Sequence, residues 1–310
     1  MTKKVWFGRC IFLSWYCDIG TCQFCYRATI KSRISHAEHA KRSLSSILVE
    51  ALLAKNLRWR IEFLTGGYKI YPMPELVEIT RLVSSIYGKK IWLNLGVLSK
   101  EDLNQFRPYV KGIVASIECI NPKLHDKICP DKQIQPYEEM FSYAGDLKKS
   151  ITIVIGLGEV RKDFSLLKQF IEKHKLNRIT FYALKPVTGT PFSHGPTEEE
   201  YTWWISETRK AFPDLQIIAG ITPRTVNYVL PVLEAGADAI TKFPATKKFG
   251  SADAISFEKQ VNEAGHEFVS TLTKFPNVDW DAQISEIDIP EKMKRDVKEQ
   301  LEMYLKRMKQ

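Results

Sequence analysis

Short apolar segments rich in β-branched residues alternate with amphipathic segments along almost the whole chain. The first kind is typical of buried strands, and the second is typical of the helices that cover them. Eight strands are predicted, at residues 5–15, 59–66, 90–96, 112–119, 150–158, 178–184, 215–222 and 239–244. Helices are predicted between them, at residues 43–56, 73–88, 99–110, 136–149, 162–175, 197–212 and 224–237.

This alternation predicts an α/β fold. Units of one strand and one helix recur at intervals of roughly 30 residues. Because no long change of composition divides the chain, they favour a closed (β/α)8 barrel of the TIM type over an open doubly wound sheet, which is the alternative. We expect the barrel to occupy residues 1–265 and a C-terminal extension to occupy residues 266–310.

The C-terminal extension ends in a predicted amphipathic helix. Its apolar residues are spaced to lie on one helical face. They are Ile289, Met293, Val297, Leu301, Tyr304 and Met308. We expect a helix that packs on the barrel, and a partner-binding tail is the alternative.

The composition is that of a globular protein, with 44% hydrophobic and 26% charged residues. No apolar run approaches the roughly 20 residues of a membrane span, and the first residues lack a signal-peptide core. We therefore expect a cytoplasmic protein without a membrane contact. The net charge of +9 suits an anionic small molecule or an acidic protein partner. A nucleic-acid partner is disfavoured, because no RNA-binding module is visible.

Three of the six cysteines stand within nine residues, as Cys17, Cys22 and Cys25 in the segment WYCDIGTCQFCYRA. They are too close together for independent disulfides, so their spacing indicates a metal site. Structural zinc sites and ordinary iron–sulfur clusters take four ligands. No further cysteine or histidine follows at a zinc-finger spacing, which leaves one metal position without a cysteine. A zinc site completed by a distant residue is the alternative, and a redox-active thiol cluster is a less favoured one.

The cysteine triplet resembles that of the radical S-adenosylmethionine enzymes. In that family three cysteines after the first barrel strand hold a [4Fe-4S] cluster, and S-adenosyl-L-methionine binds the fourth iron. An aromatic residue before the last cysteine contacts the adenine, and here it is Phe24. The resemblance implies that Cys17, Cys22 and Cys25 are the metal ligands. The chain departs from the family in having four residues instead of three between the first two cysteines.

Further segments continue this resemblance. The segment LTGGY resembles the one that holds the methionine amino group in the family, and IVIGLGE resembles the fifth-strand segment beside the adenine. SIECINPKLHDKICPD resembles the fourth-strand segment of the subgroup that contains biotin synthase, methylornithine synthase and HydE. There the acid at the position of Glu118 contacts S-adenosylmethionine. The predicted cofactor-binding residues are Phe24, Gly66, Gly67, Asn94, Glu118, Gly156, Gly158 and Arg161.

Candidate substrate contacts follow the later strands. In the subgroup the residue after the acid lines the substrate cavity, which implicates Cys119. Lys185 lies in the segment YALKPVTGTPF, and Thr222 and Arg224 lie in ITPRT. A helix that begins at Arg224 would suit a carboxylate or phosphate group.

Within the subgroup the chain is most similar to HmdB (HcgA)-like archaeal proteins, which are associated with building the iron-guanylylpyridinol cofactor of [Fe]-hydrogenase. The resemblance implies cleavage of S-adenosylmethionine to a 5′-deoxyadenosyl radical, which abstracts hydrogen from a small-molecule substrate in this pathway or a paralogous one. It also implies an external electron donor such as ferredoxin or flavodoxin. One alternative is sulfur insertion of the lipoyl or biotin type, with a second cluster on Cys10, Cys119 or Cys129. Another is a non-catalytic iron–sulfur carrier or scaffold.

Overall fold

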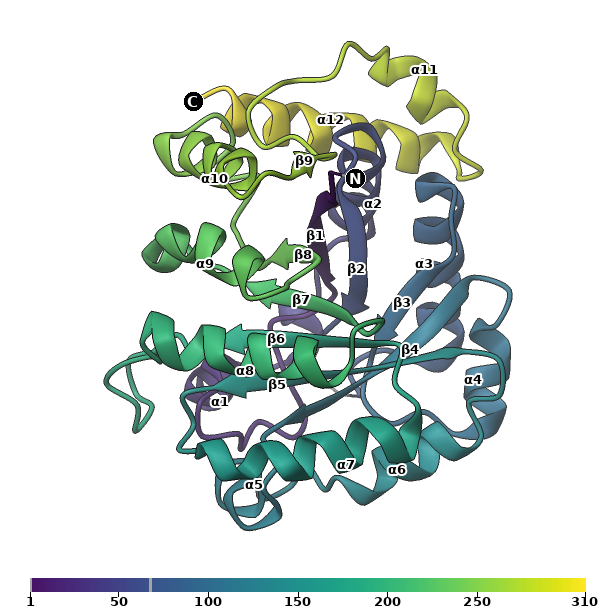
Figure 1. The fold of residues 1–310 in the computed structure, drawn as a ribbon. Helices are drawn as coiled ribbons and strands as arrows, with labels where there is room; N and C mark the ends of the chain where they lie inside the picture. Colours follow the sequence, from purple (N-terminus) through teal and green to yellow (C-terminus); the bar gives the residue numbers. More distant parts are fainter. Residues whose placement is uncertain (1, 67–68) are drawn as a thin grey trace.

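The computed structural model describes residues 2–66 and 69–310. Its centre is a closed barrel of parallel strands (Figure 1), because β1 (Lys4–Phe12) pairs with both β2 (Arg60–Thr65) and β8 (Ala239–Thr241). The strands between them pair in chain order: β3 (Ile91–Asn94), β4 (Val110–Glu118), β5 (Lys148–Ile155), β6 (Arg178–Ala183) and β7 (Gln216–Gly220). The predicted (β/α)8 barrel is confirmed, and the open doubly wound sheet is wrong.

Helices on the outside of the barrel connect each strand to the next. The predicted ones are present as α2 (Leu44–Asn56), α3 (Met73–Tyr87), α4 (Lys100–Phe106), α6 (Gln135–Ser142), α7 (Phe164–His174), α8 (Glu198–Ala211) and, after the 3₁₀ turn η4 (Pro223–Tyr228), α9 (Val229–Glu234). The sequence pattern did not predict α5 (Pro122–Ile128) or α10 (Ala252–Glu263). No helix in the described part of the chain is long and apolar enough to cross a membrane.

The helix α2 differs from the others because nearly all of it is buried. The side chain of Ser43 begins the helix by accepting a hydrogen bond from the amide of Ser46. The barrel, α3 and the C-terminal helix α12 (Glu291–Met308) all pack against it. A helix enclosed on all sides needs no polar face, which explains why this one carries so little amphipathic pattern.

The C-terminal segment returns to the start of the barrel. The strand β9 (Glu267–Phe268) pairs with β1, α11 (Trp280–Ser285) follows, and α12 lies beside α2 (Figure 1). Val297 and Leu301 are buried in this contact, and the hydroxyl of Tyr304 donates to Glu50 at 3.2 Å. The prediction of a packing helix is confirmed. The domain boundary between residues 265 and 266 stays a prediction.

A polar layer lies inside the barrel. The carboxylate of Glu62 on β2 is fully buried and accepts hydrogen bonds from Thr180 on β6 at 3.0 Å and from the Cys10 thiol on β1 at 3.1 Å. Thr241 on β8 donates to the same carboxylate. Because β2 and β6 are not neighbours in the sheet, these bonds cross the barrel interior. They close the middle of the barrel to solvent.

Candidate functional site

The three clustered cysteines lie in the loop that leaves the carboxyl-terminal end of β1. All three are half-buried. Cys25 begins the short helix α1 (Tyr26–Ile30), and its amide donates to the carbonyl of Cys22 at 3.0 Å. The amide of Gln23 donates to the carbonyl of Ile128 at 2.9 Å, which ties the loop to the end of α5. The loop is therefore fixed at the rim of the barrel where active sites of this fold form.

The enlarged gap between the first two cysteines has its own supports. Gly20 adopts a left-handed conformation with a φ of +57°, which other residues rarely adopt. The ammonium group of Lys31 donates to the carbonyls of Asp18 and Ile19. Arg27 donates to the carbonyl of Ser14 at 2.9 Å, at the start of the loop. The additional residue is thus accommodated by a glycine turn and a lysine that binds the turn's carbonyl groups.

Cys22 and Phe24 pack against a small apolar cluster at the same rim. Its buried members come from the ends of β4, β5 and β6, from the last residue of α5 and from the residue after it; they are Cys119, Ile128, Cys129, Val154, Leu157 and Leu184. Phe24 thus packs against a cluster that includes Leu157 of the turn after β5. Its contact with adenine stays a prediction.

Electrostatic effects differ among the thiols. A hydrogen bond with Cys129 lowers the pKa of Cys22, against the effect of burial, and the positive charge of Lys132 lowers it further. The same contact and burial raise the pKa of Cys129. Burial raises the pKa of Cys25.

Glu118 ends β4 in a strained conformation. Its φ is +61°, and the pairing register with β5 shifts beside it. Its carboxylate forms an ion pair with Lys132 at 2.8 Å, and the two side chains are 13% and 9% exposed. Burial is the largest single effect on Lys132 and lowers its pKa, but Glu118, together with Cys22, Tyr137 and Cys129, raises the pKa above its ordinary value. A strained residue with a buried ion pair at the strand end is the kind of feature that functional sites retain.

Lys132 is a site residue that the sequence did not indicate. It stands in the segment KICPDKQ, which has no periodicity, and it pairs with a residue on a different element. The buried ring of His125 places its two nitrogens 3.2 Å from the Cys119 carbonyl and 2.6 Å from the Lys132 carbonyl. His125 therefore holds the lysine loop against the end of β4.

Two further predicted cofactor residues lie at the rim. Gly66 follows β2, and a Cβ atom there would stand 2.8 Å from the Cβ of Leu13, so the backbone approaches the cysteine loop closely. Asn94 ends β3, and its Oδ1 accepts a hydrogen bond from Ser116 at 2.9 Å. Gly67 lies outside the described residues. Contacts of these residues with S-adenosylmethionine stay predictions.

The turn after β5 is built on two glycines. Gly156 and Gly158 have φ values of +106° and +113°. The carboxylate of Glu159 accepts hydrogen bonds from the amides of Gly156 at 2.7 Å and Leu157 at 2.9 Å. The glycines are therefore required by the turn itself, and their predicted cofactor contact stays untested.

The remaining predicted residues are more exposed. Arg161 forms an ion pair with Glu199 at 2.7 Å and lies over the ring of Trp203, so its contacts are with α8. Lys185 and Arg224 are exposed, and Thr222 forms a side-chain hydrogen bond with Thr225 at the start of η4. The structure does not bring these residues together with the cysteine loop, and their ligand roles stay predictions.

The other three cysteines do not form one group. Cys119 and Cys129 share the apolar cluster with Cys22, whereas Cys10 lies in the barrel interior and donates to Glu62. Burial raises the pKa of Cys119 to about 12, so this thiol stays protonated at neutral pH. Buried protonated thiols are inert packing groups.

The donor set at the rim fits an iron–sulfur cluster better than a single ion. Among the described residues, no group of three cysteine, histidine or acidic side chains is arranged to hold a single metal ion. Thiolates are the usual ligands of iron–sulfur clusters, each on a separate iron. Three half-buried thiols on one loop are a donor set of the chemistry that such a cluster takes.

Comparisons with known proteins give relatives over most of the chain. The chain is 34% identical over 99% of its length to the uncharacterized protein MJ0597 of Methanocaldococcus jannaschii, of which the match covers 90%. It is 25% identical over 71% of its length to 7,8-didemethyl-8-hydroxy-5-deazariboflavin synthase of Archaeoglobus fulgidus, of which the match covers 72%. No protein-family model matches the chain.

One solved structure has a clearly similar fold. The structure of methylornithine synthase superposes with a TM-score of 0.68 and 18% identity, over 86% of this chain and 84% of that chain. The two proteins share the barrel architecture.

Proposed function

We propose that this chain, which belongs to the family of the uncharacterized protein MJ0597 of Methanocaldococcus jannaschii, is a radical S-adenosylmethionine enzyme. The observation that carries this proposal is the loop after β1, which holds Cys22, Phe24 and Cys25 at the carboxyl-terminal rim of a closed barrel. Methylornithine synthase, whose fold is shared, belongs to the subgroup that the fourth-strand segment resembles. The fourth-strand segment and the fold therefore both support assignment to the radical S-adenosylmethionine enzymes.

Cys17, Cys22 and Cys25 would hold a [4Fe-4S] cluster. A cluster held there would supply the one electron needed for reductive cleavage of the C–S bond of S-adenosylmethionine. Phe24 would provide an apolar face for the adenine, backed by Leu157 and Leu184.

The Glu118–Lys132 ion pair gives these two mostly buried charges a partner each beside the thiols. The polar layer around Glu62 closes the floor of the site to water. These residues orient the bound groups and exclude solvent, and such a radical reaction requires both.

We infer that the substrate is a small molecule used in cofactor biosynthesis. Two of the compared proteins are synthases of small molecules: the relative from Archaeoglobus fulgidus makes 7,8-didemethyl-8-hydroxy-5-deazariboflavin, and the protein of similar fold makes methylornithine. The resemblance to HmdB-like proteins favours the iron-guanylylpyridinol pathway or a paralogous one. The four-residue gap, which Gly20 and Lys31 support, favours a paralogous substrate. Ferredoxin or flavodoxin would supply the electron.

Sulfur insertion is the second candidate and is less well supported. It needs a second cluster, but Cys10 lies apart from Cys119 and Cys129. A carrier or scaffold needs the cysteines but has no need of the strained Glu118 and its buried ion pair.

Anaerobic reconstitution of the full chain tests these functions. We expect about four irons and four sulfides per chain, as one cluster requires, and formation of 5′-deoxyadenosine when dithionite and S-adenosylmethionine are added. About eight irons would support sulfur insertion. A loaded cluster without cleavage would support the carrier. Bound zinc without cleavage would overturn the radical assignment.

A further inference from the structure

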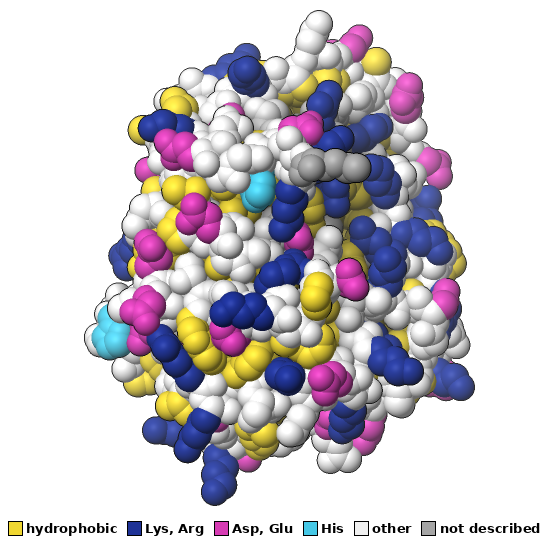
Figure 2. Space-filling view, in the orientation of Figure 1, with side chains coloured by type: hydrophobic (Ala, Val, Ile, Leu, Met, Phe, Trp, Pro, Cys, Tyr) yellow, Lys and Arg dark blue, Asp and Glu magenta, His cyan; other side chains and the backbone are white. Residues whose placement is uncertain are grey.

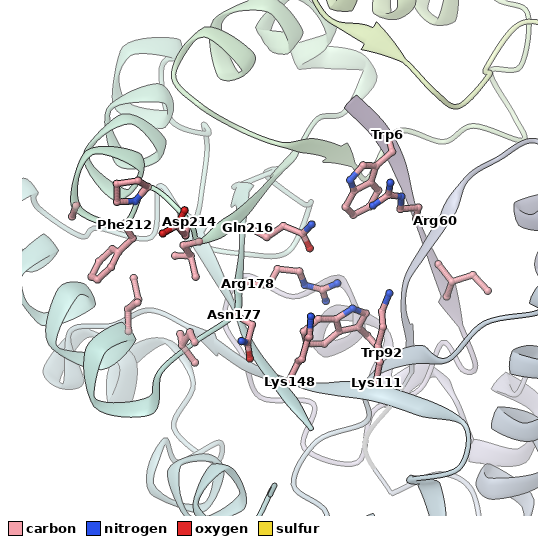
Figure 3. Close-up of a pocket in the computed structure, with 16 residues that line it drawn as sticks. Trp6, Arg60, Trp92, Lys111, Lys148, Asn177, Arg178, Phe212, Asp214 and Gln216 are labelled. Atoms are coloured by element: carbon pink, nitrogen blue, oxygen red, sulfur yellow. The ribbon is translucent and has the colours of Figure 1, made fainter. Parts of the chain in front are cut away.

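A cavity of about 690 Å³ opens at the amino-terminal ends of the strands, the end of the barrel opposite to the cysteine loop. Four cationic residues stand at or next to the starts of their strands and line this amino-end cavity; they are Arg60 on β2, Lys111 on β4, Lys148 on β5 and Arg178 on β6. Figure 3 shows the charged ends of Arg178, Lys111 and Lys148 turned toward the same part of the cavity, above Trp92, with Arg60 and Trp6 across from them.

Three of these four cations have no acidic partner in the described part of the chain. Within residues 2–66 and 69–310, Arg60, Lys111 and Lys148 form no ion pair. The charges that act most strongly on Lys111 are those of other cations, Arg178, Arg60, Lys148 and Lys89. Asp214 lines the far side of the cavity, beside Phe212 (Figure 3). On the face shown in Figure 2, Lys and Arg side chains gather near the centre and right.

Arg178 is the most constrained of the four. Only 1% of it is exposed, and its guanidinium lies 3.8 Å from the centre of the Trp92 ring. Its nitrogens donate to the backbone carbonyl of Glu62 at 3.2 Å and to the hydroxyl of Ser150 at 3.1 Å. Its hydrogen bonds go to neutral oxygens, and the buried carboxylate of Glu62 is the main anionic group that acts on its charge.

Indole rings hold two of the cations in place before any ligand arrives. The guanidinium of Arg60 lies 4.8 Å from the centre of the Trp6 ring, and Trp6 is buried, as is Trp92 beneath Arg178. Stacking of this kind fixes the orientation of a guanidinium group and lowers the entropic cost of binding. Arginine and lysine side chains together are typical of phosphate recognition.

We propose that the amino-end cavity binds a small polyanion that carries a diphosphate group. Four cations around one cavity exceed the charge of a single carboxylate, so a multiply charged ligand matches them better. The volume lies in the range of small-molecule sites, roughly 300–1,000 Å³. The ligand would offset the repulsion among the cations. This site is separate from the rim and does not depend on the proposed radical chemistry.

Calorimetric titration of the purified full chain with inorganic pyrophosphate, at constant ionic strength, tests the proposal. The double variant Lys111→Gln/Lys148→Gln should weaken binding about 100-fold, since each lost charged contact is expected to cost about tenfold. Lys168→Gln/Lys292→Gln is the matched control, because both lysines are exposed on α7 and α12, and it should stay within about twofold of the unmodified chain.

A parallel titration with ADP distinguishes the source of the diphosphate, because tighter binding of ADP than of pyrophosphate would indicate a nucleotide. If the double variant does not fold, as judged by circular dichroism, Arg60→Gln replaces it, with an expected loss of about tenfold. Equal affinity of the lysine double variant and its control would overturn the proposal, and so would absence of binding by the unmodified chain. Binding of RNA or an acidic protein with no affinity for pyrophosphate would also overturn it.

Discussion

The two ends of the barrel differ in whether their charged side chains have partners of opposite charge. At the carboxyl-terminal rim, the buried Lys132 is paired with Glu118, and the carboxylate of Glu159 is held by backbone amides. At the amino-terminal end, Arg60, Lys111 and Lys148 have no acidic partner in the described chain. The buried cation at the rim therefore already has its counterion. A site that leaves its charges uncompensated is suited to an anion from solution.

The largest expected effect is at the rim. Cys22→Ala removes one of three thiolates from the proposed cluster, so iron should fall from about four per chain to below about one. Formation of 5′-deoxyadenosine should fall to background. Iron analysis and chromatography of the cleavage products measure the two effects.

Cys10→Ser is the control for that variant, because Cys10 lies in the barrel interior and contacts Glu62. It should keep the cluster and the cleavage. If Cys22→Ala kept both as well, the ligand assignment would be wrong.

The ion pair at the rim should have the next largest effect. Lys132→Met leaves the mostly buried carboxylate of Glu118 without its cationic partner, and the free energy of unfolding should fall by about 3 kcal/mol. Urea denaturation followed by circular dichroism measures it. The exposed neighbour Lys127 supplies the control Lys127→Met, which should change stability by less than about 0.5 kcal/mol. If the free energy of unfolding fell only slightly in both variants, the Glu118–Lys132 ion pair would not stabilise the rim as described.

A third prediction concerns pH at the amino end. Partial desolvation, together with the charges of Arg178, Arg60, Lys148 and Lys89, lowers the pKa of Lys111 to about 8. A bound anion favours the protonated form, so Lys111 contributes to binding fully below pH 8, and this contribution disappears as the pH rises through the pKa of the complex. The ratio of pyrophosphate affinities between the unmodified chain and Lys111→Gln should fall from about tenfold at pH 7 to nearly one at pH 10.

Comparing two chains at each pH removes the titration of pyrophosphate itself from that ratio. A ratio that stayed constant between pH 7 and pH 10 would contradict the role given to Lys111.

The smallest expected effect is on the stability of the ligand-free protein. Lys111→Gln removes repulsion among the cations, and because this side chain is exposed the gain should be only about 0.3 kcal/mol. Thermal denaturation at low ionic strength measures it, with Lys168→Gln as a control that should show no gain. Loss of stability in Lys111→Gln would mean that an acidic partner was already present.

The sequence predicted the barrel because its strands are continuous β-branched runs and its helices are mostly amphipathic. It missed α10, where Phe257 and Val261 are the main apolar residues facing the core and the rest of the helix is polar or small. The cysteine loop was predictable because its three thiols are adjacent in sequence. Lys132 was not, because its partner Glu118 lies on another element and ion pairs of this kind leave no periodic signal.

Arg178 is a second kind of feature that the sequence pattern could not predict. An arginine at the start of a strand ordinarily faces solvent, so the segment RITFYAL gave no sign of a buried cation. Its burial depends on Trp92, which is 86 positions earlier in the chain (178 − 92), and on the closure of the barrel that brings β3 and β6 around one interior. The cluster of positive charge at the amino-terminal end is therefore apparent only once the barrel is closed.

The buried layer around Glu62 has a consequence for how this protein can change. Glu62, Thr180 and Thr241 are buried and hydrogen-bonded to one another between the two ends of the barrel, so packed side chains separate the two proposed sites. Each end can therefore gain, lose or exchange its ligand by substitutions that leave the other end intact. Evolution or engineering can therefore change the two proposed binding sites of this barrel independently.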